Sequence, residues 1–86
     1  MTLADMSRIE TPAIPPGSAL RLAAAAPALW RVIDGSGRVI GHIQALAEDA
    51  GIRYRARRFH LASRAFRDLG EFWSAGDAID CLRFAR

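Results

Sequence analysis

The segment GIRYRARRFH, residues 51–60, contains the densest positive charge in the chain. Four arginines occupy six consecutive positions in it, and no acid interrupts them. A guanidinium group is a permanently charged planar fork that donates hydrogen bonds to phosphates, carboxylates and base edges. The pattern therefore favours a surface that binds a polyanion. The arginines concerned are Arg53, Arg55, Arg57 and Arg58.

The positive charge is local to this segment and the residues that follow it. With Arg64 and Arg67, the stretch from residue 53 to residue 67 holds six arginines and no acid, whereas the rest of the chain holds six arginines and nine acids. In an extended strand, arginines two residues apart project from one face at intervals of roughly 6–7 Å, close to the spacing of phosphates along a nucleic acid.

Three interpretations of this pattern remain open from the residues alone. The arginines could bind nucleic acid, or they could meet an acidic protein partner. Alternatively, they could lie on a solvated face of a sheet and form ion pairs with nearby acids, a role with no ligand. The acids available for such pairs are Glu48, Asp49, Asp68 and Glu71.

Other residue types offer little chemistry. His42, His60 and Cys81 lack the short paired spacing of a zinc site. Ser63 and Ser74 have no nucleophile–base arrangement visible in the sequence. The GSG at residues 35–37 lies between two predicted strands with no helix or lysine after it, so it indicates a turn rather than a phosphate loop. We therefore expect no enzyme activity, no cofactor and no metal.

Length and composition indicate one small domain. The chain has 86 residues, 51% of them hydrophobic, with a single cysteine and a formal charge of +3. The sequence shows no signal peptide or membrane span, so we expect a cytoplasmic protein that does not enter a membrane. We expect residues 1–17 to form an extended, proline-rich tail and residues 18–86 to form the domain.

The expected fold is α+β, a meander of three or four antiparallel strands packed against a C-terminal helix. The alanine-rich residues 19–26 predict a short N-terminal helix, capped by Ser18 and ended by Pro27. Strands are expected at residues 29–33, 38–46, 51–59 and 66–73, with a turn at DGSG, residues 34–37. Ser74 and Asp77 resemble a capping box that starts the last helix.

Alternation of side chains assigns the two faces of this sheet. The expected core consists of Trp30, Val32, Val39, Ile43, Ile52, Tyr54, Ile79 and Leu82. The expected open face consists of Arg31, Ile40, His42, Gln44, Arg53, Arg55 and Arg57. Arg58 falls on the core parity, which predicts a bulge or the end of the strand there.

The block from Trp30 to Leu82 resembles small DNA-binding modules, the arm-binding domains of tyrosine recombinases and AP2-like domains. The residues that carry the resemblance form the stretch GEFWSAGDA: Gly70, Phe72, Ser74, Asp77 and Ala78. It implies a three-stranded sheet that lies in the DNA major groove. The segment HLASRAFRDLG is longer than the usual last hairpin of those modules.

The whole chain is also similar to short actinobacterial proteins, some labelled "DNA mismatch repair protein". The sequence contains no ATPase, mismatch-clamp or nuclease motif, so this resemblance implies at most accessory binding.

Together these observations predict a non-catalytic module that binds nucleic acid, DNA rather than RNA. The alternative is a small protein-interaction or antitoxin-like module whose basic strand meets an acidic partner or a second copy of the chain. The predicted contacts are Arg31, Arg38, Arg53, Arg55, Arg57, Arg58, Arg64 and Arg67, with His42 and Gln44 as secondary polar contacts.

Overall fold

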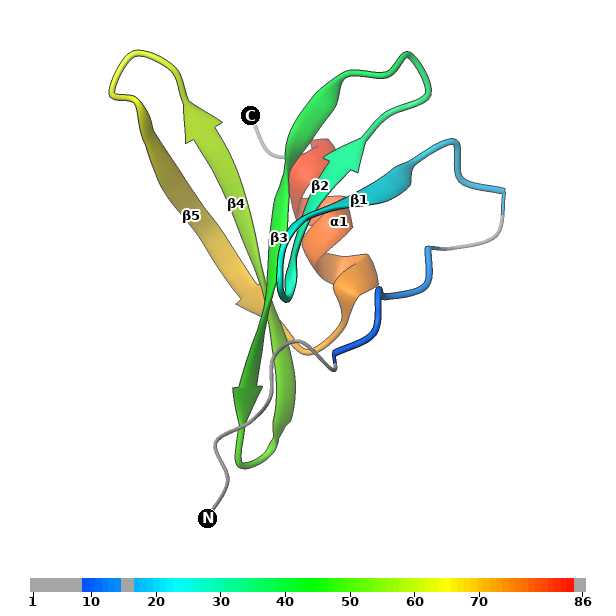
Figure 1. Cartoon of the computed structure of the whole chain (residues 1–86), viewed down its shortest axis with the longest axis vertical. Coiled ribbons are helices and arrows are strands. Elements are labelled where there is room, and N and C mark those ends of the chain that lie inside the picture. Colours follow the sequence, from blue (N-terminus) through cyan, green and yellow to red (C-terminus); the bar gives the residue numbers. More distant parts are fainter. Residues whose placement is uncertain (1–8, 15–16, 85–86) are drawn as a thin grey trace.

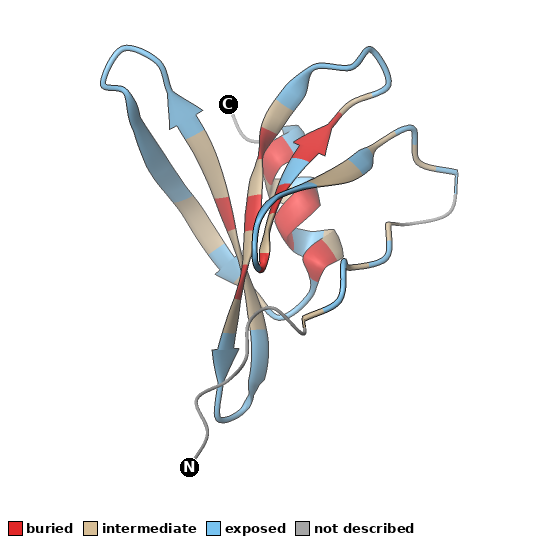
Figure 2. Ribbon diagram, viewed as in Figure 1, coloured by how far each residue is buried: buried red, intermediate tan, exposed pale blue. Residues whose placement is uncertain are grey.

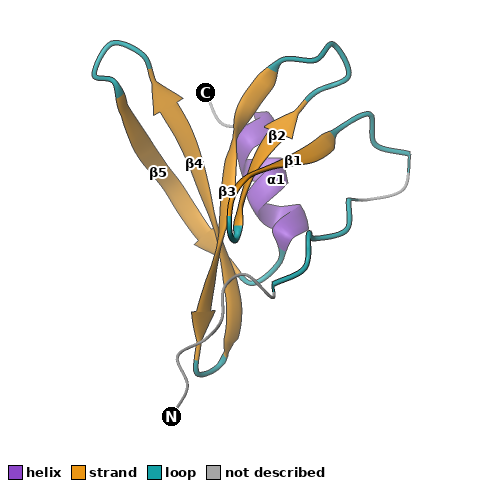
Figure 3. Ribbon diagram, viewed as in Figure 1, coloured by secondary structure: helices purple, strands orange, loops and turns teal. Residues whose placement is uncertain are grey.

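A computed structural model describes residues 9–14 and 17–84, and it has the expected α+β class. Five antiparallel strands form one sheet in sequential order, and one helix follows them (Figures 1 and 3). The sheet thus has one strand more than the largest number expected. The elements are β1 (Arg21–Ala26), β2 (Leu29–Ile33), β3 (Val39–Glu48), β4 (Gly51–His60), β5 (Ala65–Phe72) and α1 (Ala75–Phe84).

The predicted N-terminal helix at residues 19–26 is wrong, because residues 21–26 of this segment form β1. An isolated helix of this length is marginal in water, whereas pairing with β2 satisfies the backbone along one edge. Leu20 and Leu22 both pack against the core, and their spacing of two residues is the side-chain period of a strand. Pro27 starts a tight turn in which Ala28 has a φ of 59°, a geometry typical of a type II turn.

The other turns follow the sequence closely. In the β2–β3 turn, Oδ1 of Asp34 accepts hydrogen bonds from the backbone N–H groups of Ser36 and Arg38, at 2.9 and 3.0 Å. Gly37 has a φ of 89° there, which a glycine adopts without strain. Two residues connect β3 to β4, as the pairing of Glu48 with Gly51 requires. The predicted DGSG turn is therefore confirmed.

The core lies between one face of the sheet and α1 (Figure 2). Five of the eight predicted core residues are buried: Trp30, Val32, Ile43, Ile79 and Leu82. Val39 is 46% exposed because it begins β3, next to an extra residue at Ile40 that breaks the alternation opposite β2. Ile52 is 36% exposed and Tyr54 is half-buried, because they lie toward the turn end of β4.

The helix α1 packs across β3, β4 and β5. Its start is confirmed: the Ser74 hydroxyl accepts a hydrogen bond from the backbone N–H of Asp77 at 3.0 Å. The buried face of α1 consists of Ala75, Ala78, Ile79 and Leu82. Within the part of the chain that the structure describes, no helix is long and apolar enough to cross a membrane.

The side chain of Leu82 in α1 packs directly against Gly41 of β3. A Cβ at this position would collide with the side chain of Leu82 and would lie 2.9 Å from the carbonyl oxygen of Arg57. Neither group has room to move, since Leu82 is 2% exposed and the carbonyl belongs to the neighbouring strand. Gly41 therefore sets how closely the last turn of α1 approaches β3 and β4.

We expect Gly41→Ala to lower the free energy of unfolding by about 1–3 kcal/mol, the usual cost of forcing extra atoms into a packed core. Gly76→Ala is the matched control, because Gly76 lies in α1 and a Cβ there would meet only the Ser74 hydroxyl oxygen, at 3.8 Å. It should raise stability by about 0.5–1 kcal/mol through helix propensity. Urea denaturation of both variants measures the difference, and equal effects would contradict this account of Gly41.

Candidate nucleic-acid interface

The open face of the sheet carries the arginine row that the sequence predicts. Arg53, Arg55 and Arg57 lie opposite Leu46, Gln44 and His42 of β3, on the face away from α1. Arg31 of β2 lies opposite His42 on the same face. The strand β4 thus places its three alternating arginines in one row.

Acids from neighbouring segments form ion pairs with every member of this row. Arg53 lies 2.9 Å from Glu48, Arg55 lies 2.6 Å from Glu71, and Arg57 lies 2.9 Å from Asp68. Longer contacts join Arg53 to Glu71 at 3.5 Å and Arg55 to Asp68 at 3.7 Å. Three arginines therefore face three carboxylates, and the row carries little net charge.

The shortest of these ion pairs, between Arg55 and Glu71, also shifts the pKa values of both groups. The hydrogen bond from Arg55 lowers the pKa of Glu71, and the hydrogen bond to Glu71 raises the pKa of Arg55. Glu71 is exposed and Arg55 is only half-buried, so solvent screens the pair and it adds little to stability. A ligand that uses Arg55 has to displace Glu71 first.

Beyond the row, β4 and β5 continue as a two-stranded hairpin, which we call the arm (residues 58–67). The last residue of β4 that pairs with β3 is Arg57, and the next three pair with β5 alone. Every residue from Phe59 to Asp68 is exposed, as the pale blue hairpin in Figure 2 shows. The arm projects from the sheet away from β3 (Figure 1). The sequence predicts a bulge or a strand end at Arg58. The strand does not end there, because β4 continues to His60, and the β4–β5 register shifts between Ala56 and Arg57 instead.

Aromatic side chains lie on the open face at the base of the arm. Phe59 and Phe66 are cross-strand partners with ring centroids 5.5 Å apart, and they are 45% and 41% exposed. The ring of His42 meets the edge of Phe66 at 5.0 Å, and the guanidinium of Arg57 lies 4.9 Å from the centre of the same ring. Leu61, at the tip of the arm, is 80% exposed.

The opposite face of the arm carries two arginines directly across from each other. Arg58 and Arg67 are cross-strand partners, and Arg58 donates to the carbonyl oxygen of Leu82, in the last turn of α1, at 2.7 Å. This contact explains why an arginine occupies a core-parity position. Among the described residues, no acid lies within ion-pair distance of either arginine.

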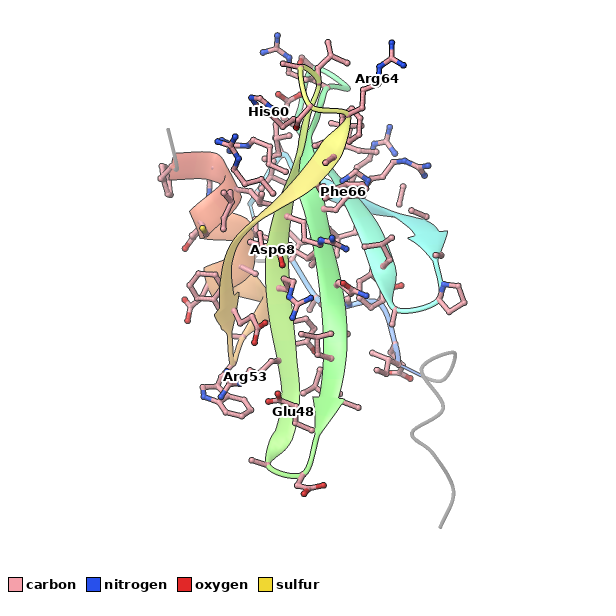
Figure 4. The ribbon with its side chains drawn as sticks, turned by 90° about the vertical axis from the view of Figure 1, so that its left-hand side faces the viewer. Glu48, Arg53, His60, Arg64, Phe66 and Asp68 are labelled. Atoms are coloured by element: carbon pink, nitrogen blue, oxygen red, sulfur yellow. The ribbon has the colours of Figure 1, made fainter. Side chains whose placement is uncertain are left out.

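Charge is separated between the two ends of the molecule. The arm, the β2–β3 turn and the last turn of α1 lie together at one end, which we call the arm end (Figure 1). The β3–β4 turn lies at the other end, and in Figure 4 Glu48 and Arg64 mark the two extremes. The arm end holds Arg38, Arg58, Arg64, Arg67 and Arg83 against Asp34 and against Asp80, which lies 3.7 Å from Arg83, whereas the β3–β4 turn holds Glu48 and Asp49.

Two further contacts in the interface are local. His60 Nδ1 lies 3.0 Å from the Ser63 hydroxyl, which also donates to the His60 carbonyl at 3.3 Å, so this pair closes the tip of the arm. Gln44, predicted as a secondary contact, accepts a hydrogen bond from Arg57 at 3.3 Å. Within residues 9–14 and 17–84, no cluster of three or more metal-binding side chains occurs.

The structure divides the predicted site residues into three groups. Arg58, Arg64 and Arg67 belong to the arm, with Arg57 and His42 at its base, and Arg38 lies at the same end. Arg31 lies on β2, where its guanidinium donates to the Ala24 carbonyl at 3.5 Å. Arg53 and Arg55 lie farther along β4 in the acid-paired row.

Sequence reasoning missed the aromatic pair of the arm. It treated residues 60–65 as a plain connection, whereas the two phenylalanines that flank this stretch pair across the strands. The available signal was the symmetric spacing FHLASRAF, with a phenylalanine on each side of a short polar stretch that contains no acid.

Comparison with protein-family models, with curated proteins and with solved structures finds no match to this chain. The resemblance to recombinase arm-binding and AP2-like modules therefore stays a prediction.

We expect His42 to titrate below the ordinary histidine value of 6.5, because burial lowers its pKa and the charges of Arg31 and Arg57 lower it further. The unfolded chain then binds the proton at a higher pH than the folded chain, so this residue makes stability fall as the pH drops below 6.5. NMR titration of the ring protons measures the pKa. Arg31→Gln should raise it, and an unchanged value would contradict the proposed cause.

Glu71→Gln should release Arg53 and Arg55 from their shared carboxylate at a small cost in stability, because solvent screens these ion pairs. Because the pKa of Glu71 is lowered in the folded state, its contribution is present above the unfolded value of 4.5 and is lost as the pH falls. The variant should therefore lose stability less steeply than the native chain in acid denaturation. If the variant and the native chain lose stability identically as the pH falls, the ion pairs of Glu71 do not contribute measurably to stability.

Proposed function

We propose that this chain is a non-catalytic module that binds nucleic acid, preferably duplex DNA, with the arm end. The observation that carries the proposal is the concentration at one end of arginines with no acid partner among the described residues: Arg38, Arg58, Arg64 and Arg67. Glu48 and Asp49 lie in the β3–β4 turn at the other end, so the molecule would orient itself in the field of a polyanion.

The shape of the arm supports a duplex as the ligand. The DNA major groove, about 12 Å wide, admits a two-stranded β-ribbon. The arm is such a ribbon, because residues 58–60 of β4 pair with β5 and do not pair with β3. A two-stranded hairpin is only marginally stable by itself in water. The ten consecutive exposed residues of this hairpin, 59–68, would therefore gain stability from a bound partner. The resemblance to modules that place a sheet in the major groove agrees with this orientation.

In this proposal the two groups of arginines act differently. The arm-end arginines contact phosphates and base edges directly, because no carboxylate has to be displaced first. Arg53 and Arg55 stay bound to Glu48 and Glu71 and contribute less. Phe59 and Phe66, with His42 and Arg57 beside them, cover the sugar and base edges nearest the sheet.

The salt dependence of binding tests the proposal. Four phosphate contacts imply a slope of about −3.6 in a plot of log affinity against log salt, from the counterion relation. The double variant Arg38→Gln/Arg64→Gln should reduce the magnitude of the slope by about 2 and weaken binding to all sequences alike. Fluorescence anisotropy with random duplex DNA, single-stranded DNA and RNA at several salt concentrations measures both quantities.

The matched control is Arg53→Gln/Arg55→Gln, which removes the same charge from the acid-paired row. It should change affinity and slope less than the arm-end variant does. A flat salt dependence, or a larger loss in the control, would contradict the proposal.

The second candidate function is a protein-interaction module, and the exposed apolar residues of the arm favour it. Phe59, Leu61 and Phe66 would bury apolar area against a protein surface whose acids meet the arginines. A chain that binds none of the three nucleic acids at low salt, and that self-associates on a sizing column, would support this function instead.

A further inference from the structure

We propose that the face of the arm nearest α1 holds a binding site for a single phosphate group, formed by Arg58, Arg67 and His60. The proposal goes beyond general polyanion binding because it assigns a defined site to one side of the arm. It rests on the proposed function for its biological ligand, a backbone phosphate. The site chemistry also predicts binding of inorganic phosphate by itself.

The first argument is the direct opposition of two like charges. Residues that oppose each other across antiparallel strands have Cβ atoms about 4.5–5.5 Å apart, and like charges at such positions are destabilising. Arg58 and Arg67 occupy one such pair, and no acid among the described residues lies within ion-pair distance of them. An anion held between the two guanidinium groups converts this repulsion into two attractive contacts.

The second argument is the shape of the surface. Arg58, Phe59, His60, Arg67 and Leu69 line a hollow of about 190 Å³ on the arm. Pockets for whole drug-sized ligands measure about 300–1,000 Å³, so this hollow suits a group the size of a phosphate rather than a whole nucleotide. Half-buried Leu69, the extra residue of β5 where the β4–β5 register shifts, forms its apolar floor.

The third argument is the fixed position of Arg58. One of its two terminal nitrogens donates to the Leu82 carbonyl oxygen at 2.7 Å, which anchors the side chain against α1. This contact also covers a carbonyl at the negative end of the helix, which would otherwise repel an anion. The remaining donors of the guanidinium stay available for a ligand, since an arginine carries five N–H groups.

Arg67 and His60 complete the donor set. Arg67 is exposed, so its fork can turn toward the ligand at low cost. The Ser63 hydroxyl contacts Nδ1 of His60, and the other ring nitrogen donates to a phosphate in the imidazolium form, in which both ring nitrogens carry protons. A phosphate has more acceptor oxygens than a carboxylate, so it can accept hydrogen bonds from both arginine forks and from the imidazolium at once.

Titration of the ¹⁵N-labelled full chain with inorganic phosphate, at constant ionic strength, tests the site. We expect saturable shifts at the amides of residues 58–69 and at the Nε groups of the two arginines. Arg67→Gln should weaken phosphate binding by roughly tenfold or more, since hydrogen bonds to charged groups are among the strongest. This variant keeps the Arg58–Leu82 contact, so the domain should stay folded, and its amide spectrum outside the arm checks this.

The matched control is Arg21→Gln, which removes an exposed arginine from β1, far from the arm in sequence. It should bind phosphate as the native chain does. Shifts that grow linearly without saturation, equal shifts with acetate, or an equal loss in Arg21→Gln would overturn the proposed site.

Duplex DNA provides the second part of the test. Phosphate binding that depends on Arg67, in a chain that does not bind DNA, would support the site while refuting the proposed function and pointing to a free phosphate or a phosphorylated small molecule. DNA binding that Arg67→Gln leaves unchanged, without saturable phosphate shifts, would refute the site while supporting the proposed function.

Discussion

At Gly41 the sheet presents no side chain, and Leu82 of α1 fills that space. This contact brings the last turn of the helix against β3 and β4, where Leu82 offers its carbonyl oxygen to Arg58. Because α1 ends at Phe84, nothing in the described helix covers β4 beyond this point. The arm therefore begins where the helix ends, and the two features are consequences of one packing arrangement.

The same residue type has two different electrostatic environments in this chain. In the row, β5 and the end of β3 supply a carboxylate for each arginine, so the charges are largely satisfied within the domain. In the arm, β5 instead places Arg67 opposite Arg58, and the charges add. The register of β4 with β5 decides which arginines are available to a ligand, although the sequence shows them as one continuous basic stretch.

Patterns that depend on neighbouring residues were predictable from the sequence. The DGSG turn, the Ser74 cap and the alternation of β4 all arise within a few residues, and all three are present. Alanine propensity misassigned β1, because pairing with β2 outweighs the weak preference of a short helix. The ion pairs of the row and the opposition of Arg58 and Arg67 depend on the β4–β5 register. A bulge at Leu69 shifts that register by one residue, and no local pattern in the sequence marks the bulge.

The exposure of the arm also separates the residues that fold the domain from those that would contact a ligand. No residue from Phe59 to Asp68 belongs to the buried core, so substitutions at the tip change the chemistry of the surface with little effect on packing. Arg58, the first residue of the arm, differs from these residues because it is half-buried and donates a hydrogen bond to Leu82 of α1. The domain can therefore accept new arm sequences of the same length, and related chains could diverge in what they bind while keeping the same sheet and helix.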